Sequence, residues 1–226
     1  MRKMYLSAPL PFVGQKRMLA KEFMKVLEQY PDGTLFVDLF GGSGLLSHIT
    51  KSLKPHSTVI YNDFDNYRFR MKHIPQTNQL LADIREMVGN SVPRHKIIKG
   101  ELRERIFSRI EQEENSTGYV DFITLSSSIL FSMKYKLSVQ DMRKEALYNN
   151  IRKTGYPECT DYLEGLEIVS CDYKEVFNRY KDIPGVVFLV DPPYLSTDVG
   201  TYNMYWNMAD YLDVLNVLKG HSYVYF

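Results

Sequence analysis

The chain has 226 residues, of which 44% are hydrophobic and 24% charged, with a formal net charge of +1. This is the composition of a globular protein with a full core, and no apolar run approaches the roughly 18 residues needed to span a membrane. The N-terminus lacks the apolar stretch of a signal peptide, and the two cysteines have no metal-ligand spacing, so we expect a reduced, cytoplasmic protein without a bound metal.

The first quarter of the chain has the pattern of helix, strand, glycine-rich turn and helix. Apolar residues recur at helical spacing over residues 15–30, and Pro31 marks the end of that helix. Residues 35–40 predict a buried strand, which runs into the glycine-rich turn 41–44 and then into a helix that lasts until Pro55. Glycines in such a turn allow the backbone to approach a ligand closely.

A second predicted strand, residues 58–62, ends at Asp63, which comes nineteen residues after Gly44. Nucleotide-binding folds place an acidic side chain roughly 20 residues after such a turn, where it contacts a ribose. From Gly42 the pattern is Gly-x-Gly-x-x-Ser, whereas dinucleotide sites have Gly-x-Gly-x-x-Gly. We therefore expect a ligand of the mononucleoside type.

The middle of the chain is helical in pattern and its charge is segregated. Residues 64–74 predict a helix that stops near Pro75, and residues 76–165 are mostly helical. Residues 94–109 hold six Lys or Arg against two Glu, and residues 129–156 hold six against one Asp and one Glu, a balance of +4 in each. Such runs are commonly solvated faces, but both are also candidate surfaces for a polyanion.

Strand patterns return at residues 166–171, 185–190 and 222–226. Together with the two earlier ones they give five strands separated by helices, which predicts an α/β fold with a doubly wound, mostly parallel sheet. The expected organisation is a sheet domain interrupted by a helical insertion, with the boundaries 1–75 plus 166–226 for the domain and 76–165 for the insertion.

The strand at 186–190 is entirely apolar and runs directly into Asp191-Pro-Pro-Tyr194. The carboxyl end of such a strand is where open α/β sheets bind ligands. Neither proline has an N–H, so the turn offers carbonyl and carboxylate acceptors beside the aromatic face of Tyr194. Acceptors next to a stacking ring suit a flat heterocycle with an exocyclic amine, which describes a nucleobase taken out of its helix.

In this order, residues 36–44, 62–65 and 191–194 resemble the motifs of the S-adenosylmethionine-dependent DNA adenine-N6 methyltransferases, in particular the Dam-like group carried by bacteria, phages and prophages. Residues 11–16 are similar to that group's N-terminal cofactor motif. The resemblance implies a class I methyltransferase fold with seven strands and the helical insertion as target-recognition domain. The chain stops inside the fifth strand, so we expect that C-terminal strands are missing from it. The group's Asn- and Gly-rich segment is replaced by residues 147–155, which leaves the DNA recognition sequence open.

The resemblance also implies the residues of the site. The catalytic residues would be Asp191, Pro192, Pro193 and Tyr194. S-adenosylmethionine would be bound by Phe12, Gly14, Lys16, Asp38, Phe40, Gly41, Gly42, Ser43, Gly44, Asp63, Phe64, Asp172, Tyr173 and Asp191. Among these, Asp63 would contact the ribose and Lys16 the methionine carboxylate. Asp172 would accept from the adenine amino group with Tyr173 packed alongside, although a helix N-cap is nearly as good an interpretation of Asp172.

The chemistry that follows is transfer of a methyl group to the N6 amine of a flipped adenine, which accepting groups on Asp191 and Pro192 would orient while Tyr194 stacks on the base. DNA is the expected partner and a monomer the favoured state; no membrane is involved. Six residues of the basic middle segment and of the polar, aromatic loop after Tyr194 are candidate DNA contacts: Lys134, Lys136, Arg143, Lys144, Tyr202 and Trp206.

Two other functions remain open from the sequence. The same site would serve an RNA adenine-N6 methyltransferase, and the chain could be a catalytically inactive DNA-binding relative. A protein-glutamine methyltransferase fits less well, because the group it would resemble has Asn where this chain has Asp191. The sequence does not decide between an orphan methylase and the partner of a restriction enzyme.

Overall fold

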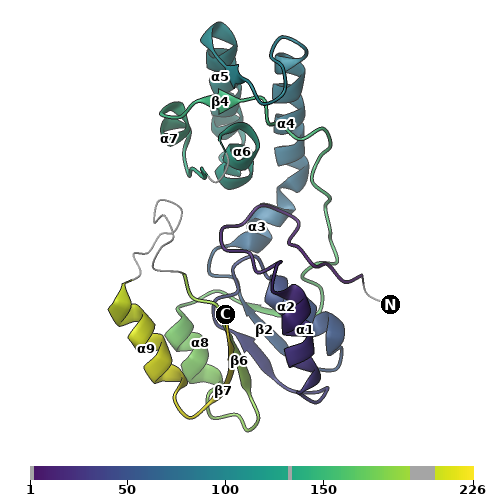
Figure 1. Ribbon diagram of the computed structural model, residues 1–226, viewed down its shortest axis with the longest axis vertical. Coiled ribbons are helices and arrows are strands. Elements are labelled where there is room, and N and C mark those ends of the chain that lie inside the picture. Colours follow the sequence, from purple (N-terminus) through teal and green to yellow (C-terminus); the bar gives the residue numbers. More distant parts are fainter. Residues whose placement is uncertain (1–2, 132–133, 194–206) are drawn as a thin grey trace.

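The computed structural model describes residues 3–131, 134–193 and 207–226, so the predicted contacts Tyr194, Tyr202 and Trp206 lie outside the described residues. The molecule has two lobes arranged along its long axis (Figure 1). One lobe contains the large sheet, and the other consists mainly of helices. The short helix α3, Tyr67–Lys72, lies between them.

Five parallel strands form the large sheet, in the order β5-β2-β1-β6-β7. Their bounds are Phe36–Asp38 for β1, Val59–Asn62 for β2, Glu167–Val169 for β5, Val187–Val190 for β6 and Ser222–Tyr225 for β7. All five were predicted, and the α/β class with a parallel sheet is confirmed. The strand order reverses direction between β1 and β6, and in such folds the ligand crevice lies outside the carboxyl ends of these two strands.

Side chains of the central strands point alternately to the two faces of the sheet, and helices cover both faces. Phe36 of β1 and Val187 of β6 pack against α1, Ala20–Glu28, and α2, Leu45–Leu53. Their neighbours Val37 and Phe188 point to the opposite face, where α8, Tyr173–Tyr180, and α9, Met208–Leu218, cover them. Apolar residues therefore occupy both faces, as expected for a doubly wound sheet.

Two predicted helix bounds are wrong. The first helix begins at Ala20 rather than at residue 15, because Gly14 has a left-handed φ of 75° and the following residues form turns. Met18, which lies within the range predicted for this helix, is 84% exposed. The helix predicted over residues 64–74 does stop near Pro75, but it covers only Tyr67–Lys72. Pro75 itself lies in the first turn of the next helix, α4, Ile74–Val88, where a proline costs no hydrogen bond.

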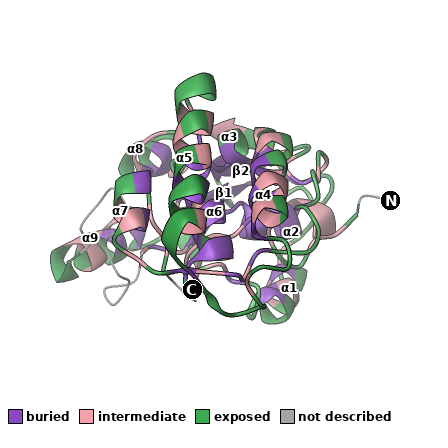
Figure 2. Cartoon of the chain, turned by 90° about the horizontal axis from the view of Figure 1, so that it is seen from above, coloured by how far each residue is buried: buried purple, intermediate pink, exposed green. Residues whose placement is uncertain are grey.

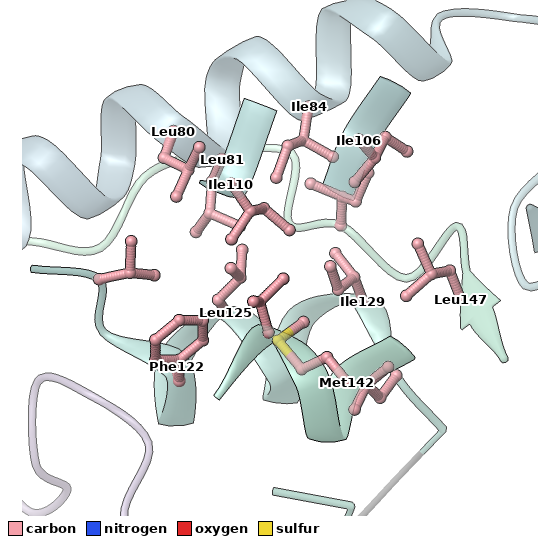
Figure 3. Close-up of a cluster of buried hydrophobic side chains, with 14 of the residues drawn as sticks. Leu80, Leu81, Ile84, Ile106, Ile110, Phe122, Leu125, Ile129, Met142 and Leu147 are labelled. Carbon is pink, nitrogen blue, oxygen red and sulfur yellow. The ribbon is translucent and has the colours of Figure 1, made fainter. Parts of the chain in front are cut away.

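The second lobe contains α4 with α5, Gly100–Thr117, α6, Phe122–Ile129, and α7, Val139–Arg143. A short antiparallel pair, β3, Ile97–Ile98, and β4, Leu147–Tyr148, was not predicted. Leu81, Ile110 and Leu125 belong to the core shared by these elements (Figure 3). In the view from above, much of α5 is exposed, whereas α6 and the strands β1 and β2 are mostly buried (Figure 2).

Candidate functional site

A cavity of about 330 Å³ opens at the carboxyl ends of β1 and β6. Its volume lies within the roughly 300–1,000 Å³ typical of small-molecule sites. The helical lobe contributes Ile123 and Leu137 to its wall, so the cavity lies where the two lobes meet. Most of the residues predicted for the site line it, namely Phe12, Gly14, Lys16, Phe40, Gly41, Gly42, Ser43, Phe64, Asp172, Tyr173, Asp191, Pro192 and Pro193.

The glycine turn forms the floor of the cavity through close backbone contacts. A Cβ atom on Gly41 would lie 2.3 Å from the ring of Tyr61, and one on Gly42 would lie 2.9 Å from the ring of Phe12. Gly42 also has a φ of 48°, which a residue with a side chain rarely adopts. The turn therefore needs glycine at both positions and presents bare backbone to a ligand.

The turn is also held from behind by the chain that returns from the helical lobe. The hydroxyl of Tyr162 donates to the Ser43 carbonyl at 3.1 Å, and its ring stacks on His48 of α2 at 4.7 Å. Nδ1 of His48 donates to the Tyr162 carbonyl at 2.7 Å, and its Nε2 accepts from the backbone N–H of Tyr5 at 2.9 Å. Three segments that are distant in sequence thus meet beneath the turn.

Asp38 is buried under the turn and does not line the cavity. Burial raises the pKa of its carboxyl to about 7, while a 2.7 Å hydrogen bond from Ser47 acts in the opposite direction and the charge of Asp191 raises it further. Asp38 therefore lies beneath the floor, and the structure brings it near the site without exposing it to a ligand.

Two aspartates follow β2, and only Asp65 faces the cavity. Asp63 is buried and accepts from the backbone N–H groups of Tyr67 at 2.6 Å and Arg68 at 3.1 Å, which satisfies the start of α3. Asp65 lines the cavity, and no hydrogen bond or ion pair reaches its carboxylate from the described residues. Partial desolvation raises the pKa of the Asp65 carboxyl, and the negative charge of Asp63 raises it further.

At the other side of the cavity, Asp172 and Tyr173 begin α8. The Asp172 carboxylate accepts from the backbone N–H of Lys174 at 2.8 Å, so it is the N-cap of that helix while still lining the cavity. The ring of Tyr173 lies 4.9 Å from that of Phe40, tilted by 33°. This end of the cavity thus combines an acceptor with aromatic faces, a combination suited to a flat ring that carries an amine.

Asp191 follows β6 and is largely enclosed. Burial raises its pKa to about 6, and Lys16 opposes that shift because its Nζ lies 2.6 Å from Oδ1 of the carboxylate. Pro192 and Pro193 continue along the cavity wall. Asp191, which was predicted to be catalytic, therefore lies in the same cavity as the glycine turn.

Arg70, Ile123 and Leu137 line the cavity although the sequence did not indicate them. Arg70 is a buried arginine on α3, and no local sequence motif predicts its place in the cavity wall. Ile123 and Leu137 belong to the helical lobe and reach the cavity only through tertiary packing. For Asp65 a sequence signal did exist, because it follows the same strand as Asp63.

The predicted DNA-contact residues in the helical lobe all have acidic partners in the structure. Lys136 precedes the cavity-lining Leu137, so part of this group lies beside the mouth of the cavity. Each of the four cations forms at least one ion pair: Lys134 and Lys136 with Glu145, Arg143 with Glu104 and Glu111, and Lys144 with Asp141. The four cations and their four partners together carry no net charge.

Within the described ranges, no group of three or more His, Cys, Asp or Glu could hold a metal ion. Among the same residues, no helix is both long enough and apolar enough to cross a membrane.

A doubly wound sheet with a nucleoside-sized cavity at its switch point is the architecture of a Rossmann-like methyltransferase. The family model of the D12 class N6 adenine-specific DNA methyltransferases matches residues 12–219. A Haemophilus influenzae protein named "Putative methyltransferase" is 38% identical over 231 residues, which cover 100% of this chain and 77% of the relative. The chain therefore belongs to the D12 class of N6 adenine-specific DNA methyltransferases, a family that implies S-adenosylmethionine as methyl donor and DNA as partner.

Proposed function

We propose that this chain transfers a methyl group from S-adenosylmethionine to the N6 amine of an adenine that is flipped out of DNA. The observation that carries the proposal is that Asp191 and residues 41–43 of the glycine turn line one cavity, at the adjacent ends of β6 and β1. A donor held on the turn would lie beside the carboxylate that orients the acceptor amine.

The residues of the cavity fit the cofactor. Gly41 and Gly42 leave room for a ligand directly on the backbone, and Asp65 offers an unoccupied carboxylate for the ribose hydroxyls. Asp172, Tyr173 and Phe40 would bind the adenine ring and its amine. When bound, S-adenosylmethionine supplies a methyl group on a positively charged sulfur. We assign the ribose to Asp65, because Asp63 is engaged at the start of α3.

Asp191 would act on the target amine by accepting one of its hydrogen bonds, with the carbonyl of Pro192 accepting the other. The lone pair of an adenine amine is delocalised into the ring, and two acceptors in fixed positions localise it on nitrogen. A carboxylate at this point also stabilises the positive charge that develops on that nitrogen. Such electrostatic preorganisation is the largest contribution to the rate enhancement of many enzymes. With a pKa of about 6, Asp191 is mostly ionised above neutral pH and able to accept.

The flipped base would enter where the two lobes meet, beside Ile123 and Leu137. Flipping requires energy for unstacking, and a stacking ring on the enzyme recovers part of it. From the sequence, Tyr194 is the ring next to Asp191, and we propose it for that role.

The test is methylation of duplex DNA by the purified chain, with the modified base and its sequence context read by single-molecule sequencing. N6-methyladenine in DNA is expected with the wild type, and its loss is expected for Asp191→Asn. The exposed Asp182→Asn is the control for loss of one carboxylate outside the site. A structured RNA assayed in parallel gives the alternative outcome: methylation of RNA but not of DNA would refute the proposal.

A further inference from the structure

The carboxylate proposed to hold the target amine is already occupied by a cation of the same chain. Nζ of Lys16 lies 2.6 Å from Oδ1 of Asp191, and the two side chains are only 8% and 15% exposed. The ammonium also donates to the Gly14 carbonyl at 2.8 Å. Oδ1 of Asp191 has almost no contact with solvent in this arrangement, so an incoming amine cannot reach it unless Lys16 moves.

Lys16 belongs to the segment 12–16 that covers the glycine turn, and it lines the cavity itself. The Lys16 ammonium can therefore pair with either of two carboxylates. One is that of Asp191, which it contacts in the structure, and the other is any carboxylate of a ligand bound on the turn. S-adenosylmethionine carries such a carboxylate on its amino-acid end. One ammonium cannot make its best contact with both groups at once.

We propose that Lys16 holds the place of the target amine on Asp191, and that the amino-acid end of the cofactor draws it away, so that a base is captured only after the cofactor is bound. The inference rests on the proposed function and adds an order of binding to it. Lys16 is in this sense a positioning residue, because it acts on the acceptor amine through Asp191.

The exchange keeps every buried charge partnered. Removing Lys16 from Asp191 without replacement would leave a carboxylate uncompensated in a poorly solvated place, which is strongly unfavourable. If Lys16 moves to the ligand carboxylate while the base amine takes its place on Asp191, each group finds a new partner as the old one leaves. A base that arrives before the cofactor finds Oδ1 of Asp191 covered by Lys16, and no cofactor carboxylate is present to take the ammonium in its place.

Fluorescence of 2-aminopurine tests the order without relying on turnover. The probe replaces the target adenine in DNA of the sequence found by methylation mapping, and its emission rises when the base leaves the stack. With wild-type protein, S-adenosylhomocysteine should raise the flipping equilibrium constant by a factor within the roughly 5–150-fold range of coupled sites. With Lys16→Met, flipping should already occur without the analogue, and that factor should fall to about one.

Lys16→Arg keeps a cation against Asp191, so its flipping should still depend on the analogue. This second variant also tests the inference if Lys16→Met fails to fold. Arg17→Met is the matched control, because it removes the neighbouring exposed charge and leaves Asp191 covered. Equal flipping by the wild type with and without the analogue would overturn this inference. Absence of flipping in both conditions would instead contradict the proposed function.

Discussion

Arg70 and Asp121 form a buried ion pair that joins α3 to the start of α6. Nε of Arg70 lies 3.1 and 3.2 Å from the two oxygens of Asp121, and both side chains are almost fully enclosed. Arg70 also donates to the Pro11 carbonyl and to the Thr124 hydroxyl. One guanidinium thus connects the N-terminal segment, α3 and the helical lobe at the wall of the cavity.

Replacing Arg70 with Met should destabilise the protein by about 3–5 kcal/mol, because Asp121 is left as an uncompensated buried charge. Urea unfolding measures the change. Arg68→Met is the control, since the Arg68 side chain is exposed on the same helix. A loss of stability no larger than that of the control would mean that Asp121 readily finds another partner.

The two aspartates after β2 should separate binding from stability. Asp65→Ala should weaken binding of S-adenosylhomocysteine by about 1.5–3 kcal/mol, the range for hydrogen bonds to a charged group. Asp63→Ala should instead lower stability by about 0.5–2 kcal/mol, as expected when the start of a helix loses its acceptor. Calorimetry and urea unfolding of both variants decide the matter, and a reversed pattern would return the ribose to Asp63.

Methyl transfer should depend on the ionisation of Asp191. Its pKa of about 6 predicts a rate that rises as pH increases through 6 and levels off above 7, because only the carboxylate accepts from the amine. Single-turnover rates across roughly pH 5–9 measure the curve. A rate that stays constant through pH 6 would show that the charge of Asp191 does not control the reaction.

The basic residues beside the cavity should contact DNA despite their acidic partners. Changing Lys134, Lys136, Arg143 and Lys144 to Ala should weaken DNA binding and lower the slope of log affinity against log salt by about 0.9 for each DNA phosphate that the variant no longer neutralises. Fluorescence anisotropy at several salt concentrations gives the slope. The control replaces four exposed cations of the sheet lobe: Lys21, Lys25, Arg179 and Lys219. Equal slopes in the two variants would show that the four basic residues form ion pairs within the protein and do not contact DNA.

Asp38 should make the protein less stable as pH rises. Its pKa is about 7 in the folded protein and roughly 4 when unfolded, so between these values the native state binds more protons and the free energy of unfolding falls with increasing pH. Asp38→Asn should remove this part of the pH dependence. Urea unfolding of both proteins at about pH 5 and pH 8 measures it, and an equal fall in stability for the two proteins would place the titrating group elsewhere.

The sequence was sufficient to predict the five strands of the sheet, because each is a short run rich in β-branched and aromatic residues. It did not predict β3 and β4, whose two residues each are too short to show a period. It also did not show that Pro75 begins a second helix directly after α3, since a proline that ends one helix and a proline that begins the next look alike in a single sequence.

The site shows the same division. The glycine turn and Asp191 could be placed because each follows a strand directly. The choice between Asp63 and Asp65 could not, because it depends on which carboxylate satisfies the N–H groups of α3. The covering of Asp191 by Lys16 joins residues that are 175 positions apart, and no local pattern encodes such a contact.

The clamp of Tyr162 and His48 beneath the glycine turn bears on the thermodynamics of ligand binding. Loops that become ordered only around a ligand lose conformational entropy at that moment, and the affinity falls accordingly. Here Ser43 is already fixed by Tyr162, and α2 is already held through His48. The turn therefore has its binding conformation before the ligand arrives. Binding then carries little entropic cost for ordering the backbone, and more of the free energy of the contacts appears as affinity.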